Sequence, residues 1–390
     1  MNHSIKGEAG PFFEDGFILD LDSLYARFES MQDQRKAKGK RYPLALVLVV
    51  AVLAKLCGED DPEGIAQWGR TRAPGLCEVL SFERQTLPCG NTYRRVLGSA
   101  LSAEELEEVV RRFLAQQPGA GRSVLISLDG KALRGTIPTG SSQGVHLLSA
   151  YMPAEGLVLM QVTVDGKENE ISAAPRVLRA LDLRGKVVVG DAMFTQRELS
   201  IQIVAGGGEY VWFAKDNQPE TRRAIEELFQ EQERVEDLQV VQRVNKEHGR
   251  METRRLLSSR LLKGYLAWPH LEQVFKLERR ATNSKGQLLH EETAYGLTSL
   301  RRKEADAEAL LGYTRGYWGI ENGLHYRRDK TFHEDATRMS NPTLAHSMAV
   351  LNNLVLGILS RQGWRTLPEA RRYYNAHLER ALPLVLRAPT

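Results

Sequence analysis

The feature that most constrains the fold is a short apolar stretch that runs directly into an aspartate, and it occurs twice. Residues 123–128 are apolar and β-branched, as in a buried strand, and Asp129 follows them. Residues 186–190 repeat the pattern before Asp191. A buried carboxylate is costly unless a cation or hydrogen-bond donors compensate it. A turn at Asp129-Gly130 is the alternative for the first copy, but two copies on neighbouring strands of one sheet favour a metal site.

Composition places the chain among soluble globular proteins with two or three domains. Of its 390 residues, 42% are hydrophobic and 26% are charged, and the net charge is only +4, so affinity for nucleic acid must come from local patches. Three cysteines without Cys-x-x-Cys spacing argue against a zinc site and a disulfide framework and fit a reducing cytoplasm. The N-terminus lacks a signal-peptide pattern, and the apolar run 44–54 is shorter than the roughly 20 residues of a membrane helix. We therefore expect neither export nor a membrane.

Residues 1–121 are predicted to form an all-helical domain that binds DNA. Pro43 precedes an apolar helix over residues 44–54, and shorter helices follow, with a loop at Pro74-Gly75 between two of them. Basic side chains lie between the apolar positions of these helices, and a solvated face is the alternative to a DNA-contacting one. These side chains are Arg70, Arg72, Arg84, Arg94 and Arg95.

Residues 122–234 alternate strands and helices, which predicts an α/β fold with a mixed sheet flanked by helices. Pro153–Gly156 separates two strand-like runs and reads as a hairpin. A polar cluster, Lys215, Asn217 and Gln218, follows the last strand, at the sheet edge where open α/β sheets bind ligands. A helix cap before Pro219 is the alternative interpretation of this cluster.

Residues 235–300 are predicted to form a β-rich insertion of four strands. The segment contains His248, Arg250 and Arg254, a dense basic stretch suited to a phosphate backbone. A charged edge strand that protects against aggregation explains the same residues equally well.

Residues 301–390 are predicted to be helical, and one helix carries a third acid. On a 3.6-residue repeat, Tyr317, Glu321, His325 and Arg328 share one face. Apolar neighbours flank Glu321, so we expect it to be semi-buried and to need a cation. Three carboxylates would supply the oxygen ligands that hard cations such as Mg²⁺ prefer.

Several short motifs, taken together, carry a family resemblance. They are Gly39-Lys-Arg-Tyr-Pro43, Leu128-Asp-Gly-Lys131, Gly190-Asp-Ala-Met-Phe-Thr-Gln196, Lys215-Asp-Asn-Gln218, His248-Gly-Arg250, Tyr317-Trp-Gly-Ile-Glu-Asn322, Leu324-His-Tyr326 and Phe332-His-Glu-Asp335. Over nearly the whole chain, the sequence resembles the ISAs1 branch of the IS4-type insertion-sequence transposases, also known from H-repeat-associated proteins. The resemblance implies an RNase H-like catalytic domain with a DDE triad on Asp129, Asp191 and Glu321, interrupted by a β-rich insertion.

The resemblance also implies a function and partners. We expect metal-dependent cleavage and strand transfer of double-stranded DNA at insertion-sequence ends, with two Mg²⁺ ions per site, replaceable by Mn²⁺. A homodimer is expected in the active complex, located in the cytoplasm at the nucleoid. Two alternatives stay open: a host-adopted DNA endonuclease, and a non-catalytic DNA-binding remnant. The three intact acids count against the remnant.

The sequence departs from the wider IS4-type signature Tyr-x2-Arg-x3-Glu-x6-Lys, because it has Thr314, Tyr317 and Arg328 where the signature has Tyr, Arg and Lys. We expect Arg328 to bind phosphate and Arg315 to replace the missing arginine. The full set of residues predicted to contact DNA is Lys131, Arg134, Lys215, Asn217, Gln218, His248, Arg250, Arg254, Arg315, Tyr317, His325 and Arg328.

Overall fold

Strand β3 (Leu125–Ala132) is an inner strand of the sheet that carries two of the predicted acids, between β4 and β6. The computed structural model describes residues 20–137, 140, 144–164, 168–230, 236–247, 249–364 and 366–388, together with the backbone of two short strands near the N-terminus. The further strands of the large sheet are β4 (His146–Met152), β5 (Leu157–Val164), β6 (Val187–Gly190), β7 (Glu209–Ala214), β8 (Gln239–Glu247), β9 (Arg250–Ser259), β10 (Gln273–Asn283) and β11 (Leu288–Thr298).

Within the described residues, these strands form one nine-stranded sheet in the order β5-β4-β3-β6-β7-β11-β10-β9-β8. Strands β3, β6 and β7 are parallel, whereas β4 is antiparallel to both of its neighbours. This order and polarity from β5 to β7 confirms the predicted mixed sheet and agrees with the RNase H-like domain that the resemblance implies. The hairpin between β4 and β5 is confirmed at Pro153–Gly156.

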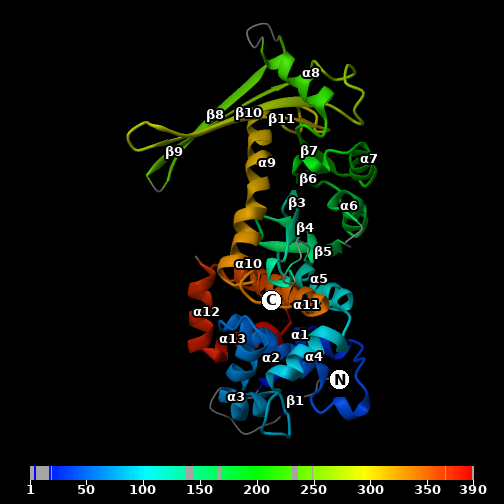
Figure 1. Cartoon of the computed structure of the whole chain (residues 1–390), viewed down its shortest axis with the longest axis vertical. Helices are drawn as coiled ribbons and strands as arrows, with labels where there is room; N and C mark the ends of the chain where they lie inside the picture. The colour runs from blue at the N-terminus through cyan, green and yellow to red at the C-terminus, as the bar shows by residue number, and fades with distance from the viewer. Residues whose placement is uncertain are drawn as a thin grey trace.

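Helices cover both faces of this part of the sheet (Figure 1). Helices α6 (Glu170–Arg179), α7 (Arg197–Ala205) and α8 (Pro219–Gln230) follow strands β5, β6 and β7 in the chain. On the opposite face lies the long helix α9 (Ala307–Ile320), which continues through a π-helical turn, η6 (Glu321–His325), into α10 (Tyr326–Lys330).

The predicted insertion extends the same sheet instead of forming a separate layer. Tyr295–Thr298 of β11 pair with Val211–Ala214 of β7, so the sheet continues into β10, β9 and β8. We call β8–β11 the wing; it projects at the end of the molecule far from the N-terminal helices (Figure 1). The local strand predictions in this region are confirmed, but the pairing of β11 with β7 joins residues distant in sequence and could not be read from any local pattern.

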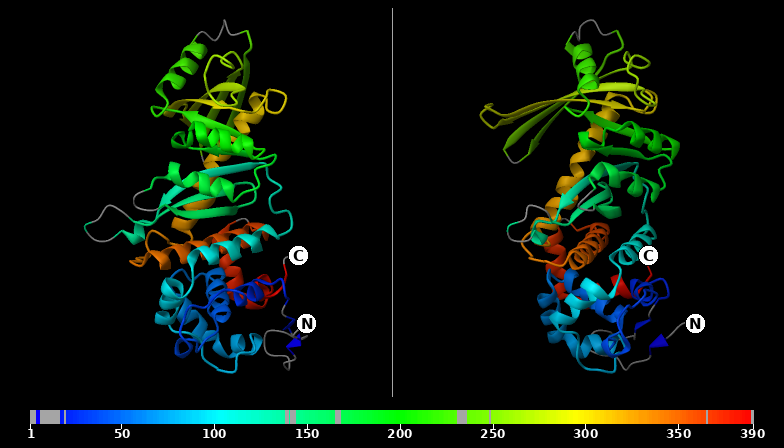
Figure 2. Two further views of the ribbon diagram at one scale, coloured as in Figure 1. Left: turned by 90° about the vertical axis from the view of Figure 1, so that its right-hand side faces the viewer. Right: turned by 45° about the vertical axis from the view of Figure 1, so that its right-hand side comes forward.

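The first and last helices of the chain pack into one helical body, so the predicted boundaries at residues 121 and 301 do not separate two compact units. Its members are α1 (Leu24–Glu29), α2 (Leu44–Leu56), α3 (Pro62–Val79), α4 (Gly90–Arg95), α5 (Ala103–Ala115), α11 (Pro342–Arg361), α12 (Leu367–Ala376) and α13 (Leu378–Leu386). The apolar helix α2 is buried throughout and contacts α11, α12 and α13. Figure 2 shows the helical body, the central strands and the wing stacked along the long axis.

The predicted loop at Pro74-Gly75 is wrong, because both residues lie inside helix α3. The buried face formed by Ile65, Trp68 and Leu76 continues through this position and holds the helix together. Pro74 is exposed, so the carbonyl that loses its hydrogen-bond donor can be solvated.

Helix α11 is, in the described part of the chain, long and apolar enough to span a membrane, but 89% of its apolar window is buried inside the protein. Its buried face contacts α5, α2 and strand β5. It is therefore a core helix that joins the helical body to the sheet.

Candidate active site

Two of the three predicted acids leave neighbouring parallel strands at the same level. Leu128 of β3 pairs with Gly190 of β6, so Asp129 and Asp191 each follow a paired residue. Neighbouring strands lie about 4.8 Å apart, which places the two residues side by side. The alternative of a turn at Asp129-Gly130 is wrong, because β3 continues past both residues in register with β4. The Asp129 side chain is 15% exposed and that of Asp191 is 42% exposed.

Glu321 begins the π-helical turn and faces Asp129 from the opposite side. Contrary to the prediction, Glu321 is exposed rather than semi-buried. Partial desolvation raises the pKa of its carboxyl, and the negative charge of Asp129 and a hydrogen bond with that residue raise it further, while His325 opposes the shift.

Tyr317 is a buried aromatic residue close to the predicted acids. Its ring is 7% exposed and packs against Phe213 and Trp318. Burial raises the pKa of the Tyr317 hydroxyl, and the charges of Asp129, Asp191 and Glu321 all raise it further. Glu170 raises it as well, so Tyr317 lies in a region of concentrated negative charge. Because Tyr317 is buried, its predicted contact with DNA is wrong in this structure.

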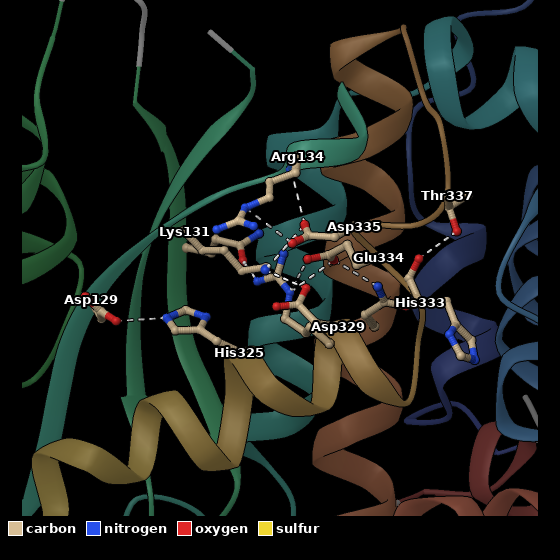
Figure 3. Close-up of polar contacts among 12 residues, drawn as sticks. Asp129, Lys131, Arg134, His325, Asp329, His333, Glu334, Asp335 and Thr337 are labelled. Carbon is tan, nitrogen blue, oxygen red and sulfur yellow. Dashed lines mark hydrogen bonds and ion pairs between the residues drawn. The ribbon is translucent and has the colours of Figure 1, made fainter. Parts of the chain in front are cut away.

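Two basic side chains meet the carboxylates directly. The ammonium of Lys215 lies 3.2 Å from Oδ1 of Asp191. Nε2 of His325 lies 3.1 Å from Oδ2 of Asp129, and the imidazole is nearly buried (Figure 3). The second ring nitrogen of His325 is buried and, in the described part of the chain, has no hydrogen-bond partner. The Lys215 ammonium balances the charge of Asp191, and the His325 ring holds Asp129 through a hydrogen bond.

The remaining residues of the polar cluster after β7 hold the loop that carries Asp191. Nδ2 of Asn217 donates to the Ala192 carbonyl at 2.6 Å, and Nε2 of Gln218 donates to the Thr195 carbonyl at 3.0 Å. Asp191 itself accepts a hydrogen bond from the backbone of Ala192 at 2.7 Å. These two amide groups therefore position the loop through their nitrogens, and the predicted contact of Asn217 and Gln218 with DNA stays a prediction.

The donor chemistry fits a hard divalent cation, because all three groups are carboxylates with exposed or partly exposed oxygens. Asp129 and Glu321 adjoin, and Asp191 lies one strand away beside Lys215. No group of three or more acidic, histidine or cysteine side chains in the described residues already has the geometry of a metal site. The negative charge of Asp129 repels that of Glu321 and contributes to the raised pKa of Glu321. A bound cation would relieve this repulsion.

Arg328 does not face DNA, and that prediction is wrong. The side chain is 0% exposed, its Nε lies 2.9 Å from a carboxylate oxygen of Glu334, and its Nη1 donates to Oε1 of Gln161 at 2.9 Å. The helical-face argument assumed a regular helix, whereas the π turn between Glu321 and His325 shifts the following residues around the axis. The prediction also could not foresee Glu334 as the buried partner.

Lys131 is likewise engaged within the protein. It is 8% exposed, and its ammonium lies 2.6 Å from Asp329 and 3.5 Å from Asp335 (Figure 3). Arg134 differs, because its side chain is 80% exposed and lies 3.9 Å from Asp335. Of the two basic residues predicted after Asp129, only Arg134 presents its charge to solvent.

A basic cleft of about 550 Å³ lies between the wing and the helix that carries Glu321. Three of the arginines predicted to contact DNA line it together: Arg250, Arg254 and Arg315. Arg254 lies 2.7 Å from Glu252, which also lines the cleft. The rest of the lining was not predicted to contact DNA and consists of Asn245, Trp318, Gly319 and Asn322. Of these residues, only Asn322 could have been singled out from the sequence, because it is adjacent to the predicted acid Glu321. The predicted His248 lies outside the described residues.

Comparison with known proteins agrees with this arrangement. The family model for the Transposase DDE domain matches residues 121–358, and a DDE_Tnp_1-associated model matches residues 25–114. The H repeat-associated putative transposase YhhI of Escherichia coli K12 is 26% identical over 350 residues, which cover 88% of this chain and 91% of that protein.

Two shorter relatives and one solved structure are also similar. The H repeat-associated putative transposase YbfD of Escherichia coli K12 is 30% identical over 60% of this chain and 93% of that protein. The uncharacterized protein in the dhlA 3′ region of Xanthobacter autotrophicus is 32% identical over 65% of this chain and 87% of that protein. A piggyBac transposase in a synaptic complex with hairpin DNA matches with a TM-score of 0.42 and 11% identity, covering 94% of this chain and 80% of that chain. On the strength of the family match over residues 121–358, the chain belongs to the DDE transposase family.

Proposed function

We propose that this protein cleaves double-stranded DNA at insertion-sequence ends and joins the released 3′ ends to a target. The observation that carries the proposal is that Asp129 and Asp191 end neighbouring parallel strands side by side, with Glu321 next to Asp129. Membership of the DDE transposase family supports the same reaction class. Two copies of the chain would act together on two ends, in the cytoplasm at the nucleoid.

Asp129, Asp191 and Glu321 would hold Mg²⁺, or Mn²⁺ in its place. When bound, such ions lower the pKa of water or a 3′-hydroxyl and stabilise the leaving oxygen of a phosphoryl transfer. The protein's own part is to keep the acids oriented. His325 fixes one oxygen of Asp129, and Lys215 limits repulsion around Asp191 until substrate and cations arrive.

The basic cleft gives the DNA a path to these acids. Its lining brings the Arg250 and Arg315 side chains together beside Asn322, the neighbour of Glu321. A guanidinium binds a phosphate through two hydrogen bonds at once, which fixes the strand in both position and direction. Lys215 and Arg134, both well exposed, would add phosphate contacts on either side of Asp191 and Asp129.

The direct test incubates the purified protein with DNA from its own flanking ends and Mg²⁺, and maps cut and joined products by sequencing. Cleaved ends joined to a target support a transposase. Cleavage without joined products would point to the alternative of a DNA endonuclease. Binding without either product, in Mg²⁺ and in Mn²⁺, would leave only a DNA-binding role.

A further inference from the structure

We propose that Lys131 and Asp329 form a positioning contact which, with the Asp129–His325 contact, locks the helix carrying Glu321 onto strand β3 and thereby sets the metal affinity of the site. The proposal rests on the proposed function and assigns Lys131 a role inside the protein in place of a DNA contact.

The two contacts match in spacing on the strand and on the helix. Asp129 and Lys131 are two residues apart on β3, so their side chains share one face about 6.6 Å apart. His325 and Asp329 are four residues apart, which corresponds to a rise of about 6 Å along a helix. The pairs meet at 3.1 Å and 2.6 Å. Figure 3 shows both helix residues reaching toward the strand.

The segment after α10 closes over the same contact. Besides its ion pair with Lys131, Asp335 accepts a hydrogen bond from the backbone nitrogen of Arg134 at 3.2 Å. The backbone nitrogen of Met339 donates to the Gly135 carbonyl at 3.0 Å. A Cβ at Gly135 would lie 2.3 Å from the Thr337 carbonyl oxygen, so the approach is too close for any other residue. The residues that directly follow β3 and the segment 331–339 are therefore held together next to Lys131.

Helix α10 depends on such contacts for its orientation. Its five residues follow the π turn that interrupts the regular hydrogen-bond pattern of α9, so α9 alone does not fix its direction. Arg328 anchors its inner side to Glu334 and Gln161, and Asn352 of α11 donates to the same Glu334 at 3.0 Å. Lys131 anchors its other side through Asp329. The direction of α10 is thus imposed by the partners around it.

The π turn joins two segments that are fixed separately. Upstream, α9 lies so close to the sheet that a Cβ at Gly316 would meet Leu125 at 2.1 Å. Downstream, α10 is tied to β3 by Lys131 and Asp329. Glu321 is the first residue of the turn between them, so its direction depends on both anchors. Releasing the downstream anchor should let the Glu321 carboxyl move away from Asp129.

The experiment compares Lys131→Met, Asp329→Asn and the double variant with the wild-type protein. Mn²⁺ affinity is measured by titration calorimetry without DNA. DNA affinity is measured in Ca²⁺ at several salt concentrations, and stability by thermal unfolding. We expect Mn²⁺ affinity to fall about tenfold in each single variant, the range found when groups that orient metal ligands are removed. The double variant should lose little more, because the two changes remove one contact. DNA affinity and its salt dependence should stay unchanged.

Lys330→Met is the matched control, since Lys330 is the exposed neighbour of Asp329 on the same helix. It should keep wild-type Mn²⁺ affinity. If Lys131→Met fails to fold, Asp329→Asn still tests the contact, because the Asp329 side chain is 31% exposed and Lys131 keeps Asp335 as a partner.

Two results would overturn the proposal. Weaker DNA binding with a flatter salt dependence would make Lys131 a phosphate contact. A lower melting temperature with unchanged Mn²⁺ affinity would make the pair merely structural. If instead the proposed function were wrong, the wild-type protein itself would show no metal-dependent cleavage, so the two outcomes can be distinguished.

Discussion

The basic side chains on the two sides of Glu321 have opposite environments. On the α9 side, Arg315 lines an open cleft together with Arg250 of the wing. On the α10 side, Arg328 is fully buried against Glu334, and Lys131 is nearly buried against two aspartates. All four were predicted to contact DNA. The comparison shows that a positive charge beside the acidic residues stays accessible only where no carboxylate inside the protein takes it up.

Substitution of the three acids that lie between these two regions should have the largest effect, a loss of DNA cleavage. Asp129→Asn, Asp191→Asn and Glu321→Gln each remove a charge while keeping the shape of the side chain. We expect each variant to lower cleavage by more than about 100-fold, beyond the loss caused by removing a group that only orients a ligand. Single-turnover cleavage in Mg²⁺ measures this, and DNA binding in Ca²⁺ should stay near the wild-type value. A variant that keeps substantial cleavage is not part of the triad.

Arg328→Ala should have the next largest effect, on folding. It leaves the Glu334 carboxylate, whose side chain is 8% exposed, without its main cationic partner. Breaking a buried ion pair from one side costs about 3–5 kcal/mol. Urea denaturation should show this loss, with Arg315→Ala on the open side as the control, within about 0.5 kcal/mol of wild type. Equal losses for the two variants would contradict the contrast between the regions.

The elements set by local pattern could be predicted from the sequence. Short apolar runs before Asp129 and Asp191 became neighbouring parallel strands, and the apolar run at 44–54 became the buried helix α2. In each case the periodicity of side chains decides the structure, and few distant partners are needed. The adjacency of Asp129 and Asp191 follows once both strands are placed in one sheet.

The features that sequence reasoning missed depend on distant partners. The position of Arg328 depends on Glu334 and on Gln161 of strand β5. The π turn at Glu321 depends on how α9 and α10 are each fixed to the sheet. Pro74 stays helical because the buried face of α3 continues past it. None of these follows from periodicity, because each is decided by packing between elements.

The buried side around Arg328 should also make the free energy of unfolding depend on pH, an effect that we do not expect from the open side around Arg315. Burial raises the pKa of Glu107 to about 8, against the lowering influence of Arg328. A folded-state pKa above the unfolded value means that the folded protein binds more protons, so stability falls as the pH rises from about 4.5 to about 8. The slope should approach about 1.4 kcal/mol per pH unit. Glu107→Gln should flatten it in denaturation curves measured across this range; an unchanged slope would mean that Glu107 ionises alike in both states.

The smallest effect is expected for the arginines of the open side, and it should appear as a loss of DNA affinity. Arg250→Ala and Arg315→Ala each remove one guanidinium from the cleft. If each holds one phosphate, DNA affinity should fall about tenfold, as for the loss of a charged hydrogen bond, and the salt dependence should flatten by about one phosphate contact. The control is Arg280→Ala, because Arg280 is exposed and follows Arg279, which stacks on Trp318 with its guanidinium 4.5 Å from the ring. Successive residues of a strand point to opposite faces, so Arg280 faces away from the cleft and its loss should leave the salt dependence unchanged. Equal losses for all three variants would show a diffuse attraction to the wing, and the cleft would then not be the path of the DNA.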